Sequence, residues 1–380
     1  MNVWMEMKLI DFMQFNPNET LSKGTVAKKV AMEYLMPFNK KVQGYIDAPF
    51  NGGTKFKNGD TLLARITPCL ENGKTAYVDF LSKNEVAFGS TEYIVLREIN
   101  GVSNSKFIFY LATSGEFRDT AIQLMTGTSG RQRVETDAFK ERIFTVPPLP
   151  EQETIAEVLS SLDDKIDLLN RQNKTLEALA ETYFRQWFIE DAKADWEEKG
   201  LDEIAEFLNG LPLQKYSYKS GEYLRAIKIK ELNNGFSDSS DMCNDKVPSR
   251  YIINNGDIVF SWSGSLALDY WKFGKGALNQ HLFKVTPNGL PAWFCYHWIK
   301  FYLTEFRGIA EDKATTMGHI QRHHLTDAKV AVPSKDELEH MDKIIQPITE
   351  KGLTNNTQIQ TLQSLRDTLL PKLISGEVSV

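Results

Sequence analysis

The sequence predicts an α+β protein in which two similar globular domains are separated by two long antiparallel coiled-coil helices. Three observations support this fold class. A heptad pattern follows the proline pair at Pro147, the same pattern returns 186 residues later at Pro333, and a stretch rich in β-branched and aromatic residues precedes each copy. This period is too long for a solenoid. The chain is therefore a duplicated two-part unit with an internal pseudo-twofold repeat.

The first long helix is predicted from Glu151 to Trp187. Apolar residues recur there at spacings of four and three for more than four heptads, which is typical of a coiled coil. At about 1.5 Å per residue the helix is on the order of 55 Å long, which suits a spacer. The predicted seam and subunit-interface residues of both long helices are Leu159, Leu162, Ile166, Leu169, Asn173, Leu176, Tyr183, Phe184, Trp187, Ile345, Ile348, Ile359, Leu362 and Leu369.

The second long helix is less regular than the first. Pro347 lies inside its heptad pattern and removes a backbone donor, so we expect a kink or break near Glu339–Gln346. Asn355 and Arg366 also occupy seam positions. In the first helix Asn173 stands at an a position, where a buried amide fixes the register. The alternative is an exposed asparagine on an unpaired stretch of helix.

The repeat divides the chain into four segments. Trp4–Phe15 and Trp196–Phe207 open the two globular domains with similar apolar spacing, which predicts one or two helical turns in each. Asn-Gly-Asp sequences at Asp60 and Asp257 indicate turns in equivalent places. The predicted boundaries are a first globular domain at 1–146, a first spacer helix at 147–190, a second globular domain at 191–332, and a second spacer helix with the C-terminal tail at 333–380.

Both globular domains are expected to mix strands and helices. Runs of β-branched and aromatic residues bounded by turn residues indicate strands, and each domain has one apolar helical stretch near its end. The predicted strands are Thr61–Ile66, Thr75–Leu81, Val86–Arg97, Tyr223–Lys230, Ile258–Ser261, Ala267–Phe273 and Gly276–Val285, and the predicted helices are Ser105–Met125 and Pro291–Ala310.

Composition limits the class of protein. The chain has 380 residues, which is enough for two or three domains, and 42% hydrophobic and 25% charged residues are ordinary for a globular protein. The formal net charge of −6 does not favour nucleic-acid binding, but net charge is a weak guide because acidic helices can mask basic faces elsewhere in a chain. Three widely spaced cysteines predict no disulfide framework. Without a signal peptide or a long apolar run, the cytoplasm is the expected location.

Two polar loops lie at equivalent places in the repeat. Thr126–Arg133 and Thr315–His324 combine short side chains, which let a backbone approach phosphates, with arginine and glutamine, which pair with base edges. The alternative is a pair of solvated loops. Asn279–His281 is predicted inside a strand. Burial of these three polar side chains without hydrogen-bond partners would be costly, so they are expected to face a ligand. Nearby aromatic residues are core candidates as well. The candidate DNA-binding residues are Arg65, Thr128, Ser129, Arg131, Gln132, Arg133, Lys228, Trp262, Ser263, Lys275, Asn279, Gln280, His281, Thr315, Thr316, His319, Gln321 and Arg322.

Signatures of bond chemistry are missing from the sequence. It has no Asn-Pro-Pro-Tyr tetrapeptide, no GxGxxG or GxSxG motif, and Pro68 stands where a P-loop requires glycine. His319, His323 and His324 have partly helical spacing, but the loop context and the adjacent Arg322 disfavour zinc. We therefore expect no catalytic residue, no metal and no cofactor on this chain.

Two motifs nevertheless resemble a known family. Val146–Gln152 leading into Ile155–Ile166, and Leu369–Val378 at the C-terminus, are similar to the conserved regions of the specificity subunit of type I restriction–modification systems. Val332–Leu338 is a weaker version of the first motif. The resemblance covers the whole chain, although in the globular domains it is limited to the layout and the polar loops.

The resemblance implies a noncatalytic DNA-recognition subunit. Each globular domain would read one half of a bipartite, asymmetric target, and the helices would set the spacer. Two modification subunits that bind S-adenosylmethionine and methylate adenine at N6 would dock on the helices, on faces that include Leu168, Phe184 and Phe188. Restriction subunits that use ATP and Mg would join them. The alternatives are a coiled-coil scaffold without DNA specificity and a stand-alone methyltransferase or nuclease.

Overall fold

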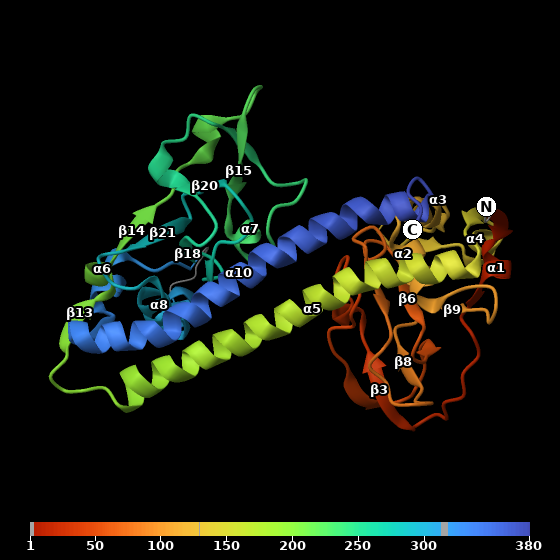
Figure 1. Cartoon of the computed structure of the whole chain (residues 1–380), viewed down its shortest axis with the longest axis horizontal. Helices are drawn as coiled ribbons and strands as arrows, with labels where there is room; N and C mark the ends of the chain where they lie inside the picture. The colour runs from red at the N-terminus through yellow and green to blue at the C-terminus, as the bar shows by residue number, and fades with distance from the viewer. Residues whose placement is uncertain (1–3, 129, 313–317) are drawn as a thin grey trace. The chain divides into compact units, whose positions relative to one another are not determined.

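The computed structural model describes residues 4–128, 130–312 and 318–380, and it divides the chain into two compact units. Unit 1 comprises residues 1–166 and 362–380, and unit 2 comprises residues 167–361. Both units mix helices with antiparallel and parallel strands, as the α+β prediction requires. The unit boundaries cross the two long helices, so each helix contributes to both units (Figure 1).

Unit 1 contains two four-stranded sheets. The first has the strand order β2-β9-β6-β7 and the second has the order β4-β3-β8-β5, in which β3 and β8 are parallel. The pairs β1-β12 and β10-β11 are separate. The elements are β1 Met5–Lys8, α1 Leu9–Phe12, β2 Met13–Phe15, β3 Val26–Val30, β4 Ile46–Pro49, β5 Lys55–Phe56, β6 Thr61–Ala64, β7 Thr75–Tyr77, β8 Ala87–Gly89, β9 Tyr93–Glu98, α2 Ser105–Thr113, α3 Gly115–Gln123, β10 Met125–Thr126, β11 Arg133–Val134, α4 Thr136–Lys140 and β12 Ile143–Val146.

Unit 2 repeats the order of both four-stranded sheets and the separate pair β1-β12. Its sheets have the orders β14-β21-β18-β19 and β16-β15-β20-β17, again with one parallel pair, β15 and β20, and β13-β22 is separate. The elements are β13 Glu197–Gly200, α6 Leu201–Ile204, β14 Ala205–Asn209, β15 Tyr223–Ile227, α7 Ile229–Asn234, β16 Met242–Asn244, β17 Ile252–Ile253, β18 Ile258–Ser261, β19 Leu268–Tyr270, β20 Gly276–Leu278, β21 Leu282–Pro287, α8 Ala292–Asp312, α9 Arg322–Asp327 and β22 Lys329–Val332.

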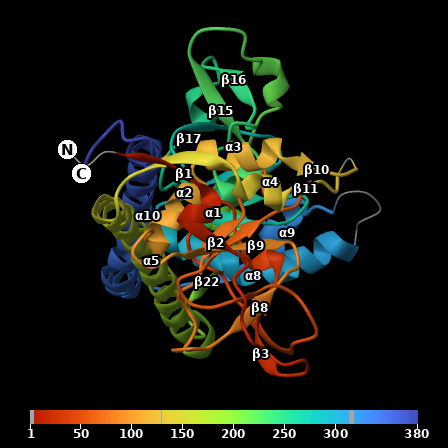
Figure 2. The ribbon, with the colours of Figure 1, turned by 90° about the vertical axis from the view of Figure 1, so that its right-hand side faces the viewer.

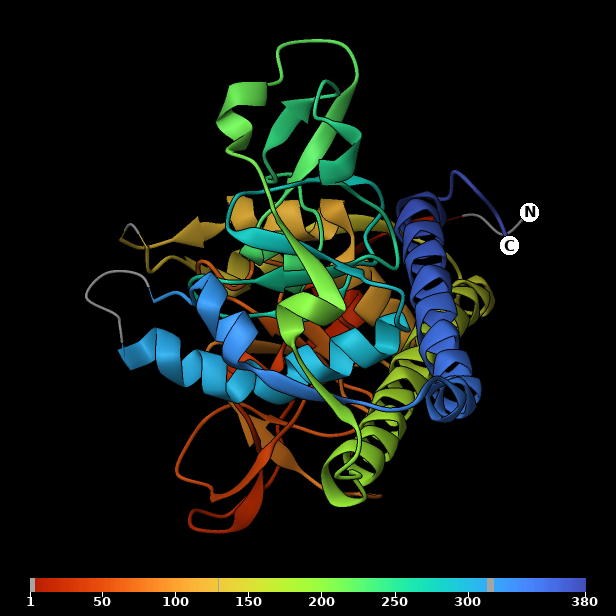
Figure 3. The same cartoon turned by 90° about the vertical axis from the view of Figure 1, so that its left-hand side faces the viewer.

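Each unit has three layers because its first sheet is buried on both faces. Successive side chains of a strand point to opposite faces. In β6, Leu63 lies in the core that contains α2, and Leu62 lies in the core that contains the second sheet. Figure 2 shows α2 and β8 on opposite sides of β2 and β9, which belong to the first sheet. In β18, Phe260 lies in the core that contains α8, and Val259 lies in the core that contains the second sheet. Figure 3 shows α8, in light blue, below the strands of the first sheet of this unit. The helix, first sheet and second sheet therefore follow the same order in both units.

The repeat extends to single hydrogen bonds. The Trp4 indole N–H donates to Glu151 at 3.1 Å, and the Trp196 indole N–H donates to Glu337 at the same distance. Each tryptophan thus joins the start of a globular body to the start of the long helix that follows it. The predicted helical turn after each tryptophan is confirmed, since α1 and α6 are single turns between two strands.

Asp60 and Asp257 also occupy equivalent places. Each carboxylate accepts a hydrogen bond from the backbone N–H three residues earlier, at 2.7 Å and 2.8 Å. Each also pairs with a cation of a central strand, Arg97 at 2.6 Å for Asp60 and Lys284 at 2.8 Å for Asp257. The predicted turn role is confirmed, and it is combined with an ion pair that ties the turn to the sheet.

The long helices are α5, Leu149–Arg185, which ends in a π-helical turn at 186–190, and α10, Lys335–Ile374. In unit 1, Arg366 pairs with Asp163 at 2.8 Å, and in unit 2 the Asn173 amide donates to Asn356 at 2.8 Å. From the first pair to the second, the residue number rises by ten on α5 and falls by ten on α10. The two helices are therefore antiparallel. Asn173 also accepts from the buried Asn355 at 2.9 Å, so the alternative of an unpaired, exposed asparagine is wrong.

Of the kink or break predicted near Glu339–Gln346, the break is wrong. The helix α10 runs through Pro347 without interruption. Proline removes one hydrogen bond of the helix interior, but Ile345 and Ile348 on either side pack in the main core of unit 2. Tertiary packing of the flanking turns therefore maintains the helix across the missing bond.

Most predicted seam positions are buried or half-buried, but two aromatic residues were assigned to the wrong environment. Phe184 and Phe188 were expected on a free helix face, whereas both are buried in the core of unit 2 against Trp298. Leu168 remains 39% exposed. The buried seam residues are Leu159, Ile166, Leu169, Ile345 and Ile359, and the half-buried ones are Leu162, Asn173, Leu176, Tyr183, Trp187, Ile348, Leu362 and Leu369.

Several predicted elements are divided by turns. The helix expected over 105–125 splits at Ser114, whose hydroxyl caps α3 by accepting from the Phe117 N–H at 3.4 Å. The strand expected over 86–97 splits at Ser90, which accepts from the Glu92 N–H at 3.1 Å. The strand expected over 276–285 ends at Leu278 and resumes at Leu282. Local side-chain hydrogen bonds to the backbone interrupt runs whose composition alone favours continuity.

Candidate nucleic-acid interface

A short backbone frame in unit 1 brings three distant segments together. Arg65 follows β6, Glu92 precedes β9, and Arg133 begins β11. The Arg65 N–H donates to the Glu92 carbonyl at 3.0 Å, and the Val134 N–H donates to the Arg65 carbonyl at 2.9 Å. The frame therefore fixes where the side chains of Arg65, Glu92 and Arg133 emerge at the end of the first sheet.

The three side chains of this frame form an ionic cluster. The Arg133 Nε and Nη2 groups donate to the Glu92 carboxylate at 2.7–3.0 Å, and the Arg65 Nε approaches the same carboxylate at 3.4 Å. The hydrogen bonds from Arg133 hold the pKa of Glu92 below its ordinary value, against the opposing effect of partial burial. The side chains of Arg133, Arg65 and Glu92 are 44%, 32% and 21% exposed, so the cluster lies at the surface.

Unit 2 contains the same backbone frame. Trp262 follows β18 and His281 precedes β21. The Trp262 N–H donates to the His281 carbonyl at 3.4 Å, and the Ile320 N–H donates to the Trp262 carbonyl at 3.0 Å. A bridge between Ser263 and His319 corresponds to the bridge between Ile66 and Arg133 in unit 1. Trp262, His281 and His319 therefore occupy the places of Arg65, Glu92 and Arg133.

In unit 2 the side chains on the frame are aromatic. The Trp262 ring lies 5.9 Å from the His281 ring and 6.2 Å from the His319 ring, measured between centroids. The Trp262 indole N–H is shared between Asn209 at 3.0 Å and the Gln280 carbonyl at 3.2 Å. This half-buried cluster offers ring faces and the Gln280 amide to a partner, where unit 1 offers guanidinium groups.

The duplicated frame agrees with a duplicated match to a known family. The family model for the type I restriction modification DNA specificity domain matches residues 1–178 and, a second time, residues 193–364. The chain belongs to this family. Membership identifies it as a specificity subunit of a type I restriction–modification system, the noncatalytic component that recognises the DNA target. The resemblance stated from the two sequence motifs is thereby confirmed.

Individual relatives extend the likeness along the chain. The specificity subunit of the type I restriction enzyme MjaIX from Methanocaldococcus jannaschii is 27% identical over 304 residues, which are 73% of this chain and 69% of that protein. The HindI specificity subunit from Haemophilus influenzae is 22% identical over 413 residues, which cover 87% and 89% of the two chains. The crystal structure of a type I S subunit from M. genitalium has the same fold, with a TM-score of 0.60 and 17% identity over 98% of this chain and 96% of that one.

The remaining candidate DNA-binding residues of this specificity subunit lie in different environments. Ser263 and Asn279 are buried, and their contact with DNA stays a prediction. Asn279–His281 is not inside a strand but forms the turn before β21. Lys228 forms an ion pair with Asp241. Thr128, Arg131, Lys275, Gln321 and Arg322 are exposed, Gln132 and Gln280 are half-buried, and Ser129, Thr315 and Thr316 lie outside the described residues.

Sequence reasoning missed Glu92, which holds two of the predicted arginines. The residue was hidden inside the predicted strand 86–97. Alignment of the two copies at the starts of β9 and β21 places Glu92 opposite His281, which was a candidate. A position-by-position comparison of the two repeats would therefore have identified Glu92 from the sequence.

Two other classes of feature are absent from the described residues. Within that part of the chain, no group of three histidine, cysteine, aspartate or glutamate side chains is arranged to hold a metal ion. None of the described helices combines the length and apolarity needed to cross a membrane.

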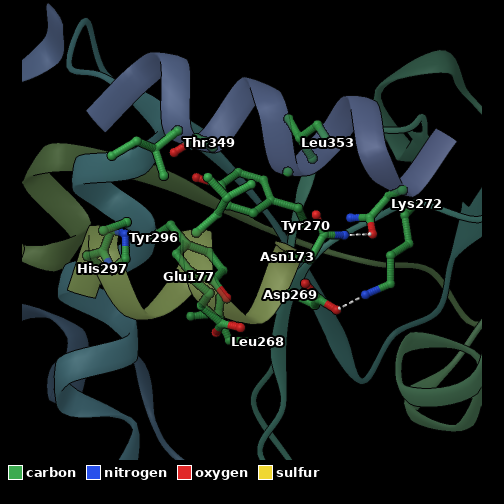
Figure 4. A pocket seen from close by; sticks show the side chains of 15 residues that line it. Asn173, Glu177, Leu268, Asp269, Tyr270, Lys272, Tyr296, His297, Thr349 and Leu353 are labelled. Atoms are coloured by element: carbon green, nitrogen blue, oxygen red, sulfur yellow. Dashed lines mark hydrogen bonds and ion pairs between the residues drawn. The ribbon is translucent and has the colours of Figure 1, made fainter. Parts of the chain in front are cut away.

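A hollow of about 270 Å³ lies in unit 2 between the long helices and the globular body. Figure 4 shows Asn173 and Glu177 of α5, Leu353 of α10, and Tyr270 and His297 of the globular body around it. Its lining mixes apolar side chains with an amide pair and the Asp269–Lys272 ion pair. It is lined by none of the residues of the Trp262 cluster, so it is separate from the candidate interface.

His297 at this hollow predicts a pH dependence of stability. Burial, assisted by Lys300, lowers its pKa to about 4, whereas Glu181 and Glu177 oppose the shift. The unfolded state therefore binds more protons between about pH 6.5 and pH 4, and stability is lost as the pH falls through that range. Urea titrations at about pH 6.5 and pH 4 measure this acid-induced loss of unfolding free energy. The loss should be roughly 3 kcal/mol smaller in His297→Phe than in the unsubstituted chain. An equal acid-induced loss in the variant and the unsubstituted chain would exclude His297 as its source.

Proposed function

We propose that each unit of this specificity subunit reads one half of a bipartite DNA target. The duplicated backbone frame supports this proposal, because it presents one cluster of polar or aromatic side chains from each unit. In this division residues 1–146 and 191–332 are the target-recognition domains. The helical segments 147–190 and 333–380 set the spacer, because recognition by paired modules depends on their separation.

The long helices are proposed to dock two modification subunits that bind S-adenosylmethionine and methylate adenine at N6. Restriction subunits that use ATP and Mg would join the assembly. Leu168, Leu179 and Leu365 are exposed apolar side chains of the two long helices and are the candidate contact residues for this docking. Contacts of lysine and arginine with phosphates would make DNA binding strongly dependent on salt.

A methylome tests the proposal. The chain is expressed with the modification subunit encoded beside it in a host that lacks DNA methylation, and N6-methyladenine is mapped by sequencing. We expect one motif with two short defined halves around a fixed gap. Methylation at a single undivided motif would contradict reading by two units. Assembly of the complex without any methylation would favour the coiled-coil scaffold.

A further inference from the structure

The side chains on the two equivalent backbone frames differ in chemical type. Unit 1 places two guanidinium groups and one carboxylate on it, a net charge of +1, whereas unit 2 places Trp262, His281 and His319 there. No arginine or lysine occupies the three equivalent positions of unit 2. Because the backbone hydrogen bonds agree, this difference lies in the side chains and not in the fold.

We propose that Arg65 and Arg133 read a guanine base in the half-target of unit 1 and that Glu92 is the residue that positions them. The proposal rests on the proposed function and adds the base identity to it. Guanine presents two acceptors, O6 and N7, in the major groove, and a guanidinium fork matches both. The unit 2 cluster, by contrast, has no guanidinium fork for this contact.

The hydrogen bonds to Glu92 leave the necessary donors available. Arg65 engages Glu92 through Nε, and its terminal nitrogens make no hydrogen bond within the described part of the chain. Arg133 engages Glu92 through Nε and Nη2, so its Nη1 makes no hydrogen bond to these residues. A carboxylate bound on the Nε side of a guanidinium group restrains the group without occupying the edge formed by its two terminal nitrogens. The side chain then loses less conformational freedom when it binds a base.

Arg131 is the matched comparison in the same loop. It is exposed, and no ion pair or hydrogen bond of its side chain is found among the described residues. A flexible, unrestrained cation suits a phosphate, whose contact carries no sequence information. Substitution of Arg131 should therefore weaken binding to all sequences alike, whereas substitution of Arg133 should reduce discrimination at one base pair. The ion pairs of Arg65 and Arg133 with Glu92 are at the surface, where such pairs contribute little to folding.

The test uses the assembled complex with its modification subunit and a labelled duplex that carries the motif found by the methylome. Each guanine in turn is replaced by 7-deazaguanine, which lacks the N7 acceptor but keeps Watson–Crick pairing. We expect one replacement to weaken binding about tenfold or more. Arg133→Gln and Arg65→Gln should abolish that difference, Arg131→Gln should retain it, and Glu92→Ala should reduce it more than Glu92→Gln.

The outcomes separate this inference from the proposed function. Uniform weakening by Arg133→Gln, with the 7-deazaguanine effect intact, would assign Arg133 to a phosphate and overturn the inference. A bipartite motif in which no 7-deazaguanine substitution matters would overturn it as well, while leaving the two-unit reading in place. Lack of any bipartite motif would overturn the proposed function itself.

Discussion

Replacing Arg366 by leucine is expected to lower the free energy of unfolding by about 3 kcal/mol, measured by urea titration. Arg366 lies on α10 and donates to the Asp163 carboxylate of α5 at 2.8 Å. Asp163 is only 7% exposed, and its other oxygen accepts from the Tyr110 hydroxyl at 2.6 Å. Without the arginine, the buried carboxylate would keep the Tyr110 hydroxyl as its hydrogen-bond partner, and the desolvation of the charge would be much less well offset.

An exposed ion pair on α5, the helix that carries Asp163, is the control. Arg171 forms an ion pair at the surface with Asp167, which lies one helical turn earlier in the chain. Arg171→Leu should therefore change the free energy of unfolding by less than about 0.5 kcal/mol. The double variant Arg366→Leu with Asp163→Leu should recover much of the loss, because no charge is then left unpaired. A cost for Arg366→Leu as small as that of Arg171→Leu would contradict a buried pair at this site.

Replacing Phe184 by alanine is expected to destabilise unit 2 by about 4 kcal/mol. The Phe184 ring contacts His297, Trp298 and Phe188 at centroid distances of 5.1–5.4 Å, and it is fully buried between α5 and α8. Truncation removes the transfer free energy of the ring and leaves a cavity that its rigid aromatic neighbours cannot fill. The loss should appear as a lower midpoint of urea unfolding.

Leu168 provides the complementary control on the same helix. At 39% exposure, Leu168→Ala should cost less than about 0.5 kcal/mol of stability. If the exposed helix face binds a modification subunit, this variant should instead weaken assembly, measured by co-purification at low concentration. Loss of assembly without loss of stability in Phe184→Ala would contradict the core position of Phe184.

The architecture was predictable because duplication and heptad spacing are properties of the sequence itself. Leu159 and Ile345 mark the seams of helices whose period is visible without the structure, and Trp4 and Trp196 mark the equivalent starts of two bodies. The strand boundaries were less predictable. Ser90 and Ser114 interrupt apolar runs through single hydrogen bonds to the backbone, and composition does not reveal whether such a bond forms.

The environments of single residues depended on tertiary contacts. Heptad spacing placed Phe184 and Phe188 beside the seam, but it cannot show that α8 covers that side of α5. Pro347 disfavours a helix locally, and only the packing of Ile345 and Ile348 explains its continuity. Arg65 and Arg133 were identified as polar loop residues, whereas their convergence on Glu92 required the pairing of segments that are far apart in the chain.

The most direct test of reading by two separate units compares the methylomes of two variants. Arg133→Gln changes the unit 1 cluster, and Gln280→Ala changes a half-buried residue beside the Trp262 cluster of unit 2. We expect Arg133→Gln to relax a position in one half of the motif only, and Gln280→Ala to relax a position in the other half only. Changes by both variants in the same half would contradict the assignment of one half-target to each unit.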